Sequence, residues 1–281
     1  MTYPFQIVDV FGRAGLAGNP VAIVFDAPDV PVERMQRLAT WLNLSETVFL
    51  SAPTEPGADY RARIFSLDRE LPFAGHPTLG ACHAWLSAGG KPAAGDRVIQ
   101  QCGVGLITVR RGDSGNAFAA PPLVRGGPVS AGDLAEVLAV LGLAQTDVIE
   151  ARWVDNGPGW VAVLLASAEA VLEVEPARYH SKPVTIGLVG PHAPGAGPAY
   201  EVRAFFSDGY GAIREDPVCG SLNASVAQWM VSSDRARAPY HAGQGARVGS
   251  DGRIDISCDA EGQVWVGGAA RVLVSGVIDL A

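Results

Sequence analysis

The chain has 281 residues, enough for two domains of ordinary size or one large one. Apolar residues make up 48% of the chain and charged residues 18%, a composition that can fill buried cores and excludes a disordered protein. The net charge is −8, and lysine and arginine never form a run longer than two residues, which argues against nucleic acid and anionic membranes as partners.

The N-terminus predicts a strand rather than a targeting segment. No basic region precedes its apolar residues and no small-residue cleavage site follows them. No stretch of the chain approaches the roughly 18 consecutive apolar residues of a membrane helix. The cysteines form no Cys-x-x-Cys pair, which predicts free thiols without a disulfide framework or metal site at Cys82, Cys102, Cys219 and Cys258. We therefore expect a cytoplasmic protein.

Short alternating or β-branched runs bounded by Gly, Pro, Asp or Asn predict the strands. In chain order these runs are Phe5–Phe11, Val21–Phe25, Thr47–Leu50, Tyr60–Ser66, Arg97–Gln101, Gly105–Arg110, Arg253–Cys258 and Gln263–Gly267. Apolar residues three and four apart, or runs of small apolar residues, predict the helices Val32–Leu42, Thr78–Leu86, Asp133–Leu141 (capped by Ser130) and Leu222–Met230. Because the strands occur in clusters and do not alternate with helices, the chain is predicted to be α+β with mostly antiparallel sheets.

One pattern occurs twice, about half a chain apart. A loop containing Gly75 opens a helix that ends Ala-Trp-Leu, and a loop containing Gly220 opens a helix that ends Gln-Trp-Met. Aligning Trp85 with Trp229 gives an offset of 144 residues, and a pair of strands follows each helix. The sequence therefore predicts two pseudo-symmetric domains, residues 1–122 and 123–281, the first of which the C-terminal strand can complete.

Each of these two loops presents backbone N–H groups and the positive end of a helix dipole. If the halves face each other, both helix N-termini converge on one cleft that suits a small carboxylate. The same groups would stabilise the enolate-like charge that forms when a neighbouring C–H ionises. The alternative for either loop is that Gly and Pro simply make the turn.

Residues near these loops could carry a proton. Glu46 begins an apolar strand; enclosed there, it would have the raised pKa that a general acid–base near pH 7 requires, and the alternative is an exposed strand end. His76 lies in the first loop and Asp216 in the second, and the alternative for each is a solvated turn residue. Cys219 stands at a helix N-terminus, which favours a nucleophilic or basic thiolate, and the alternative is a small residue packed under a turn.

Taken together, the motifs resemble the PhzF (phenazine biosynthesis-like) family, which has the diaminopimelate epimerase-like fold. The matching segments follow the family's order and span most of the chain: Asp9-Val10-Phe11, Gly18-Asn19-Pro20-Val21-Ala22, Asn43-Leu44-Ser45-Glu46-Thr47, Leu71-Pro72-Phe73-Ala74-Gly75-His76-Pro77-Thr78 and Glu215-Asp216-Pro217-Val218-Cys219-Gly220-Ser221. Each motif alone is weak, whereas the set is highly specific. The resemblance implies two domains, each a mostly antiparallel sheet wrapped round a central helix, with the active site between them. It also implies a homodimer that needs no cofactor or metal.

The same resemblance implies isomerisation of a dihydro-hydroxyanthranilate by proton shuttling. Glu46 matches the glutamate that removes and returns the proton, and His76 and Asp216 match residues that hold the substrate and assist. The positions that match substrate-binding residues are Asn19, Gly75, Gly220 and Ser221.

One departure from the related epimerases bears on the mechanism. Those enzymes use two opposed cysteines, whereas this chain has Ala74 in the first loop and Cys219 in the second. We therefore expect a cofactor-independent isomerase that moves a proton on a small cyclic carboxylate, with Glu46 as the single acid–base. The alternatives are an epimerase or dehydratase that uses Cys219 as a second base with Glu46, and a non-catalytic PhzF-like binding protein.

Overall fold

The computed structural model describes residues 1–112, 115–195 and 197–280. The chain divides into two compact units: a first unit of Met1–Ala119 with Gly267–Ala281, and a second unit of Ala120–Val266. None of the helices within the described ranges combines the length and the apolar character needed to cross a membrane.

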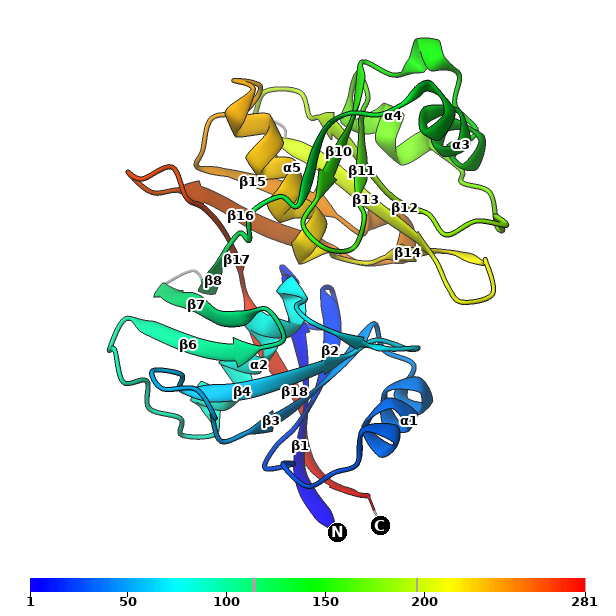
Figure 1. The fold of residues 1–281 in the computed structure, drawn as a ribbon. Helices are drawn as coiled ribbons and strands as arrows, with labels where there is room; N and C mark the ends of the chain where they lie inside the picture. Colours follow the sequence, from blue (N-terminus) through cyan, green and yellow to red (C-terminus); the bar gives the residue numbers. More distant parts are fainter. Residues whose placement is uncertain (113–114, 196, 281) are drawn as a thin grey trace. The chain divides into compact units, whose positions relative to one another are not determined.

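The first unit is a sheet wrapped round a helix. Its strands are β1 (Thr2–Val10), β2 (Asn19–Val24), β3 (Glu46–Ser51), β4 (Tyr60–Phe65), β5 (Glu70–Leu71), β6 (Arg97–Cys102), β7 (Gly105–Gly112), β8 (Gly115–Ala119) and β18 (Ala270–Asp279), and its helices are α1 (Val32–Leu42) and α2 (Gly75–Ser87). The strands pair in the order β18-β1-β2-β3-β4-β6-β7-β8, with β5 added to β4. The pairs β2–β3 and β4–β6 are parallel, and the others are antiparallel. Helix α2 contacts β18 and β8, the two ends of this order, as well as strands between them (Figure 1).

Helix α2 lies inside the sheet, and its buried residues, most of them small or apolar, are not confined to one stripe. A side chain at Gly80 would prevent this, since a Cβ there would come 2.4 Å from Cγ1 of Val21 in β2. Helix α1 instead has one buried stripe, Met35, Leu38 and Ala39, which packs against apolar residues of β2, β3 and β4. Only α2 is therefore enclosed by the strands of the first unit.

The second unit repeats this arrangement. Its strands are β9 (Arg125–Pro128), β10 (Glu150–Asp155), β11 (Val161–Leu164), β12 (Thr185–Pro191), β13 (Tyr200–Ser207), β14 (Ile213–Asp216), β15 (Tyr240–Gln244), β16 (Gly252–Cys258) and β17 (Val264–Gly268), the last of which leads back to the first unit. Its helices are α3 (Ala131–Leu141), α4 (Ala168–Glu173) and α5 (Gly220–Ser232), with short 3-10 turns at Gln145–Asp147 and Ala246–Val248. The strands pair in the order β9-β10-β11-β12-β13-β15-β16, with β14 added to β13 and with β11–β12 and β13–β15 parallel. Helix α5 thus corresponds to α2, and α4 joins parallel strands as α1 does.

The predicted α+β class, with mostly antiparallel sheets and a central helix in each half, is confirmed. The central helices differ from the predicted alignment by one residue, because an offset of 145 separates Gly75 from Gly220. Successive helix residues point about 100° apart. The ring of Trp85 is half-buried and lies 5.3 Å from that of Tyr60, whereas Trp229 is buried, so the two tryptophans occupy different faces of their helices.

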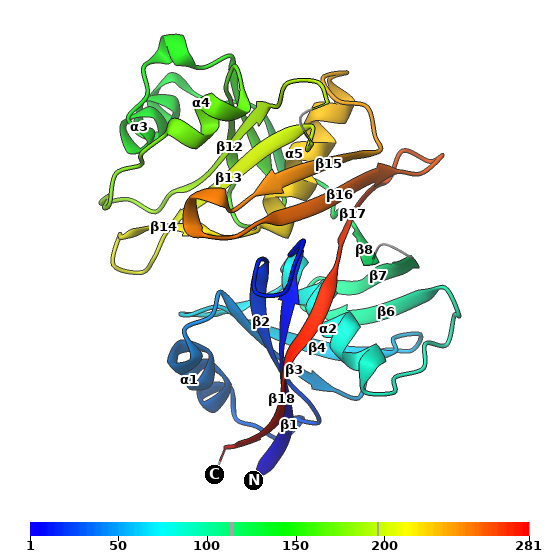
Figure 2. The same ribbon diagram turned by 180° about the vertical axis from the view of Figure 1, so that it is seen from behind.

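The far end of the chain completes the first unit. Strand β18 pairs antiparallel with β1 from Thr2–Asp279 to Val10–Ala270, and Figure 2 shows the two strands side by side, red beside dark blue. Val10 of β1 is fully buried, while Val277 of β18 is 70% exposed.

Candidate active site

Glu46 is the first residue of β3 and follows the turn that ends α1. Asn43 closes α1 in the left-handed conformation with φ of 54°, which asparagine tolerates better than most residues. Strand β3 then pairs with β2, where Glu46 lies opposite Val21. The side chain of Glu46 is only 14% exposed, so the carboxylate is largely enclosed and is not an exposed strand end.

His76 lies in the first turn of α2, beside Glu46. Its Nε2 is 3.3 Å from Oε2 of Glu46, a close polar contact that is not aligned as a hydrogen bond. The imidazole is 3% exposed, and this burial lowers the pKa of His76 to about 3. His76 is therefore neutral near pH 7, and Glu46 does not have a histidine cation beside it.

Asn19 contacts the other ring nitrogen of His76. Its Nδ2 lies 3.5 Å from Nδ1 of His76, and both residues are buried. With the Asn19 amide as donor, Nδ1 accepts, and the single proton of the neutral ring is on Nε2, the nitrogen that faces Glu46. Asn19, His76 and Glu46 thus form one chain of polar contacts within the first unit.

Asp9 holds the loop that leads to Asn19, a role that the sequence analysis does not assign. Its Oδ1 accepts the N–H of Gly18 at 2.9 Å, and its Oδ2 accepts the N–H of Ala17 at 3.3 Å. The loop is tight, because a Cβ on Gly18 would lie 2.2 Å from the carbonyl oxygen of Val10. The sequence feature that could have indicated this role is an aspartate at an otherwise apolar strand end, followed by closely spaced glycines.

The predicted residues of the second half lie together at the start of α5. Asp216 is the last residue of β14, and Cys219 is the N-cap residue of α5 and is 5% exposed. Gly220 and Ser221 are the first two residues of the helix. Sγ of Cys219 lies 3.4 Å from Oγ of Ser221.

Two residues that the sequence analysis missed contact Ser221. The indole N–H of Trp160 donates to Oγ of Ser221 at 3.0 Å, and Nδ2 of Asn156 donates to the Ser221 carbonyl at 2.9 Å. Both belong to a turn in which Oδ1 of Asp155 accepts two backbone N–H groups at 2.7 Å. The hydroxyl of Ser221 accepts from the indole and keeps its own hydrogen for donation, and in its contact with Cys219 either the hydroxyl or the thiol can be the donor. The available signal is the Asn-Gly-Pro-Gly-Trp turn itself.

The central helices begin without the side-chain caps that α3 and α4 have. Ser130 and Ser167 cap α3 and α4 by accepting backbone N–H groups at 3.1 and 3.2 Å. The N-cap residues of α2 and α5 are Ala74 and Cys219, whose side chains make no such bond. An N-terminus of this kind is suited to an anion, because N–H groups and the helix dipole point toward it.

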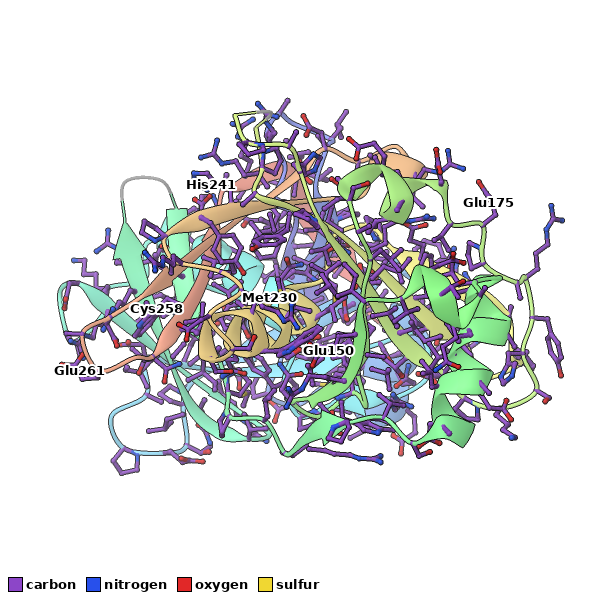
Figure 3. All side chains as sticks on the ribbon, turned by 90° about the horizontal axis from the view of Figure 1, so that it is seen from above. Glu150, Glu175, Met230, His241, Cys258 and Glu261 are labelled. Carbon is purple, nitrogen blue, oxygen red and sulfur yellow. The ribbon has the colours of Figure 1, made fainter. Side chains whose placement is uncertain are left out.

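Ala74 and Cys219 occupy the same N-cap position in the two units. The two-thiol arrangement of the related epimerases thus lacks its first thiol at this position. The predicted free thiols are present, including Cys258 in β16 (Figure 3). Burial raises the pKa of Cys82 to about 12, which makes this thiol unreactive. Within the described parts of the chain, no three His, Cys, Asp or Glu side chains are grouped so that they could hold a metal ion.

Residues 8–276 match the family model of the PhzC/PhzF proteins, described as phenazine biosynthesis-like protein. The chain belongs to this family. Antisense-enhancing sequence 1 of Schizosaccharomyces pombe is 31% identical over 98% of both chains. A trans-2,3-dihydro-3-hydroxyanthranilate isomerase of Pseudomonas aeruginosa is 33% identical over 92% of this chain and 91% of its own. The crystal structure of a PhzF-family protein from Bacillus anthracis superposes with a TM-score of 0.81 at 21% identity, covering 99% of each chain.

Membership of the PhzC/PhzF family confirms the predicted diaminopimelate epimerase-like fold, which solved structures of a racemase and an epimerase also share. It confirms the predicted enzyme class as well, since full-length relatives are named isomerases: the chain is an isomerase. The roles of individual residues and the substrate stay predictions.

Proposed function

We propose that the protein moves a proton on a small cyclic carboxylate without a cofactor, with Glu46 as the single acid–base. The observation that supports Glu46 most directly is its enclosed carboxylate, 3.3 Å from a neutral His76 at the uncapped start of α2. A neutral imidazole, unlike an imidazolium, adds no positive charge that would lower the pKa of the neighbouring carboxylate and weaken it as a base.

The proton transfers balance within one residue and one substrate. The Glu46 carboxylate takes a proton from a carbon of the substrate and becomes a carboxylic acid, while the C–H electron pair spreads toward the substrate's carboxylate. The acid then returns its proton to a different carbon, which shifts the double bond and regenerates Glu46. The substrate gains and loses one proton, so no oxidant or reductant is needed.

The other predicted residues would bind the substrate and stabilise the charge. In the first unit the N–H groups that begin at Gly75 would suit a carboxylate, and in the second unit those that begin at Gly220, with the hydroxyl of Ser221, would do the same. His76 would donate from Nε2, and Asn19 would hold its ring. Asp216 would orient a polar group of the substrate.

The substrate class is inferred from the relatives. A relative that is 33% identical is named for trans-2,3-dihydro-3-hydroxyanthranilate, a cyclic carboxylate with an acidic ring C–H. We propose a substrate of this chemical class.

The experiment is deuterium uptake in D2O, measured by mass spectrometry on a panel of cyclic and α-amino carboxylates that includes this compound, in the presence of EDTA. We expect Glu46→Gln to lower the uptake rate by about 10²–10⁴-fold while the carboxylate still binds. The matched control is Glu70→Gln, which removes a partly exposed carboxylate of the same unit that pairs with Arg63. Full activity in Glu46→Gln would refute the assignment.

The alternatives give different outcomes in the same experiment. An epimerase or dehydratase that uses Cys219 would also lose uptake on Cys219→Ser. The alanine at the matching N-cap, Ala74, favours the single-base reaction. Absence of uptake from every compound would favour the binding-protein alternative.

A further inference from the structure

A buried glutamine bridges the turn that precedes α5. Gln244, the last residue of β15, is 2% exposed. Its Oε1 accepts the N–H of Cys219 at 3.1 Å, and its Nε2 donates to the carbonyl of Asp216 at 3.0 Å. One carboxamide therefore joins both ends of the turn Asp216–Cys219, whose last residue is the N-cap of the helix.

Asn223 extends this bridge into the helix. It is also 2% exposed, and its Nδ2 donates to the carbonyl of Cys219 at 2.9 Å and to Oε1 of Gln244 at 2.8 Å. The backbone that directly follows β15 packs closely against the turn, because a Cβ on Gly245 would lie 2.5 Å from the carbonyl oxygen of Pro217. The turn is thus held from inside the unit by two amides.

The first unit has a similar network of buried polar side chains at the start of α2. Thr78, like Asn223, is the fourth residue after the N-cap, and its Oγ1 donates to the carbonyl of Ala74 at 2.9 Å. Gln100 of β6 donates from Nε2 to Oγ1 of Thr78 at 2.8 Å. Thr78 and Gln100 are fully buried. A strand glutamine below the helix start therefore occurs in both units.

Buried amides are costly unless every polar atom finds a partner, and an apolar side chain of the same size could fill the space. The two networks lie at the starts of the two central helices, whose N-cap residues Ala74 and Cys219 supply no side-chain cap. Helix α1 also lacks such a cap, since it follows Pro31, whereas α3 and α4 are capped by serines. A helix N-terminus that binds a ligand must hold its N–H groups in place before the ligand arrives. A side-chain cap would also hold them, but it would accept their hydrogen bonds and so compete with the ligand.

We propose that Gln244 and Asn223 are positioning residues that hold the N–H groups at the start of α5 in the orientation that binds the substrate carboxylate. Neither residue contacts the substrate; both act through the turn Asp216–Cys219. This inference rests on the proposed function, in which Gly220 and Ser221 receive the carboxylate.

The test compares Gln244→Met with Gln228→Met. Methionine keeps the length of the side chain and removes its hydrogen bonds. Gln228 is a matched control, because it lies near the other end of α5 and its Nε2 also donates to a backbone carbonyl, that of Pro121, at 3.0 Å. Two readouts are made on the full-length chain: hydrogen exchange of the segment 217–225 by mass spectrometry, and calorimetric titration with 3-hydroxyanthranilate, a stable aromatic carboxylate.

We expect Gln244→Met to exchange faster in this segment and to bind 3-hydroxyanthranilate at least about tenfold more weakly, because the N–H groups lose their fixed direction. Gln228→Met should change neither. The conservative Gln244→Glu should recover affinity as the pH is lowered, since only the protonated carboxyl can donate to the Asp216 carbonyl as the amide does.

Each result has one meaning. Unchanged exchange in Gln244→Met, or faster exchange with unchanged affinity, overturns the positioning role. Equal loss of affinity in Gln228→Met overturns it too. A wild-type chain that does not bind 3-hydroxyanthranilate overturns the ligand that we assign to the α5 N-terminus. Binding that depends on Gln244, with uptake that does not depend on Glu46, supports the positioning role and refutes the proposed base.

Discussion

The imidazole of His76 loses its ability to take up a proton when the chain folds. Its pKa falls from 6.5 to about 3 because the ring is buried. Between these values the unfolded chain binds the extra proton and the folded chain does not. The stability that the neutral ring contributes to the folded protein is therefore fully present above about pH 6.5. As the pH falls below this value, the unfolding free energy decreases by about 1.4 kcal/mol per pH unit for one such group.

Urea unfolding between about pH 6 and pH 4 tests this expectation for His76. The His76→Gln variant should lose less stability over this range than the wild type, by about 1.4 kcal/mol per pH unit. The control is Gln100→Met, which changes a buried side chain that does not titrate and should keep the slope of the wild type. Parallel curves for the wild type and His76→Gln would show that the folded protein protonates this ring.

Functional residues could be predicted from the sequence where they belong to a local motif. They could not be predicted where their role depends on partners that only the fold brings close. Glu46, His76 and Asn19 belong to local motifs, and the structure brings these three together within the first unit. Gln244 has no distinctive local pattern, and the turn that carries Trp160 does not indicate which residue the indole contacts. Their importance comes from neighbours such as Asp216 and Ser221, more than 25 residues away in the chain, which only the folded structure brings close.

At the level of elements, adding a side-chain cap to an uncapped central helix should stabilise the fold and weaken ligand binding. Ala74→Ser should supply a cap to α2 and raise the unfolding free energy by about 0.5–1 kcal/mol. The new hydroxyl would accept the N–H that we assign to the substrate, so binding of 3-hydroxyanthranilate should weaken several-fold. Urea unfolding and calorimetry measure the two effects.

The control for this variant is the reverse change on an outer helix. Ser130→Ala removes the cap of α3 and should lower the unfolding free energy by about 1 kcal/mol without an effect on binding. Undiminished binding by Ala74→Ser would mean that the α2 N-terminus does not hold the carboxylate.

Elements with a strong local pattern were predicted well, and those defined by tertiary contacts were not. Helix α1 has the predicted bounds, Val32–Leu42, because its apolar stripe and flanking Pro31 are explicit. Helix α2 begins at Gly75 and not at Thr78, since Pro77 is tolerated in a first turn although Gly-His-Pro reads as a loop. A C-terminal strand that completes the first domain is expected from the sequence, but the bounds of β18 are not predicted, because most of its residues are exposed and its pairing with β1 spans nearly the whole chain.

For the whole molecule, the pairing of β1 with β18 makes the two units unequal in their dependence on the C-terminal segment. A chain that ends at Ala269 should lose amide protection in the first unit, since β1 and α2 both contact β18. The second unit has its own core of residues within 120–266 and should keep its protection. Hydrogen exchange by mass spectrometry distinguishes the units, and a chain that ends at Asp279 is the control. Equal protection of the first unit in both chains would contradict this expectation.

The same pairing determines the order in which the protein can fold as it is made. Strand β1 leaves the ribosome before the other strands that the structure describes, and its partner β18 begins 260 residues after the end of β1. At about 5–20 residues per second, β1 waits roughly 13–50 s with one edge unpaired. All strands of the second unit before β17 emerge within this interval. The first unit therefore begins to form first but is completed last. Until β18 is made, the unpaired edge of β1 is a place where a chaperone or a neighbouring nascent chain has time to bind.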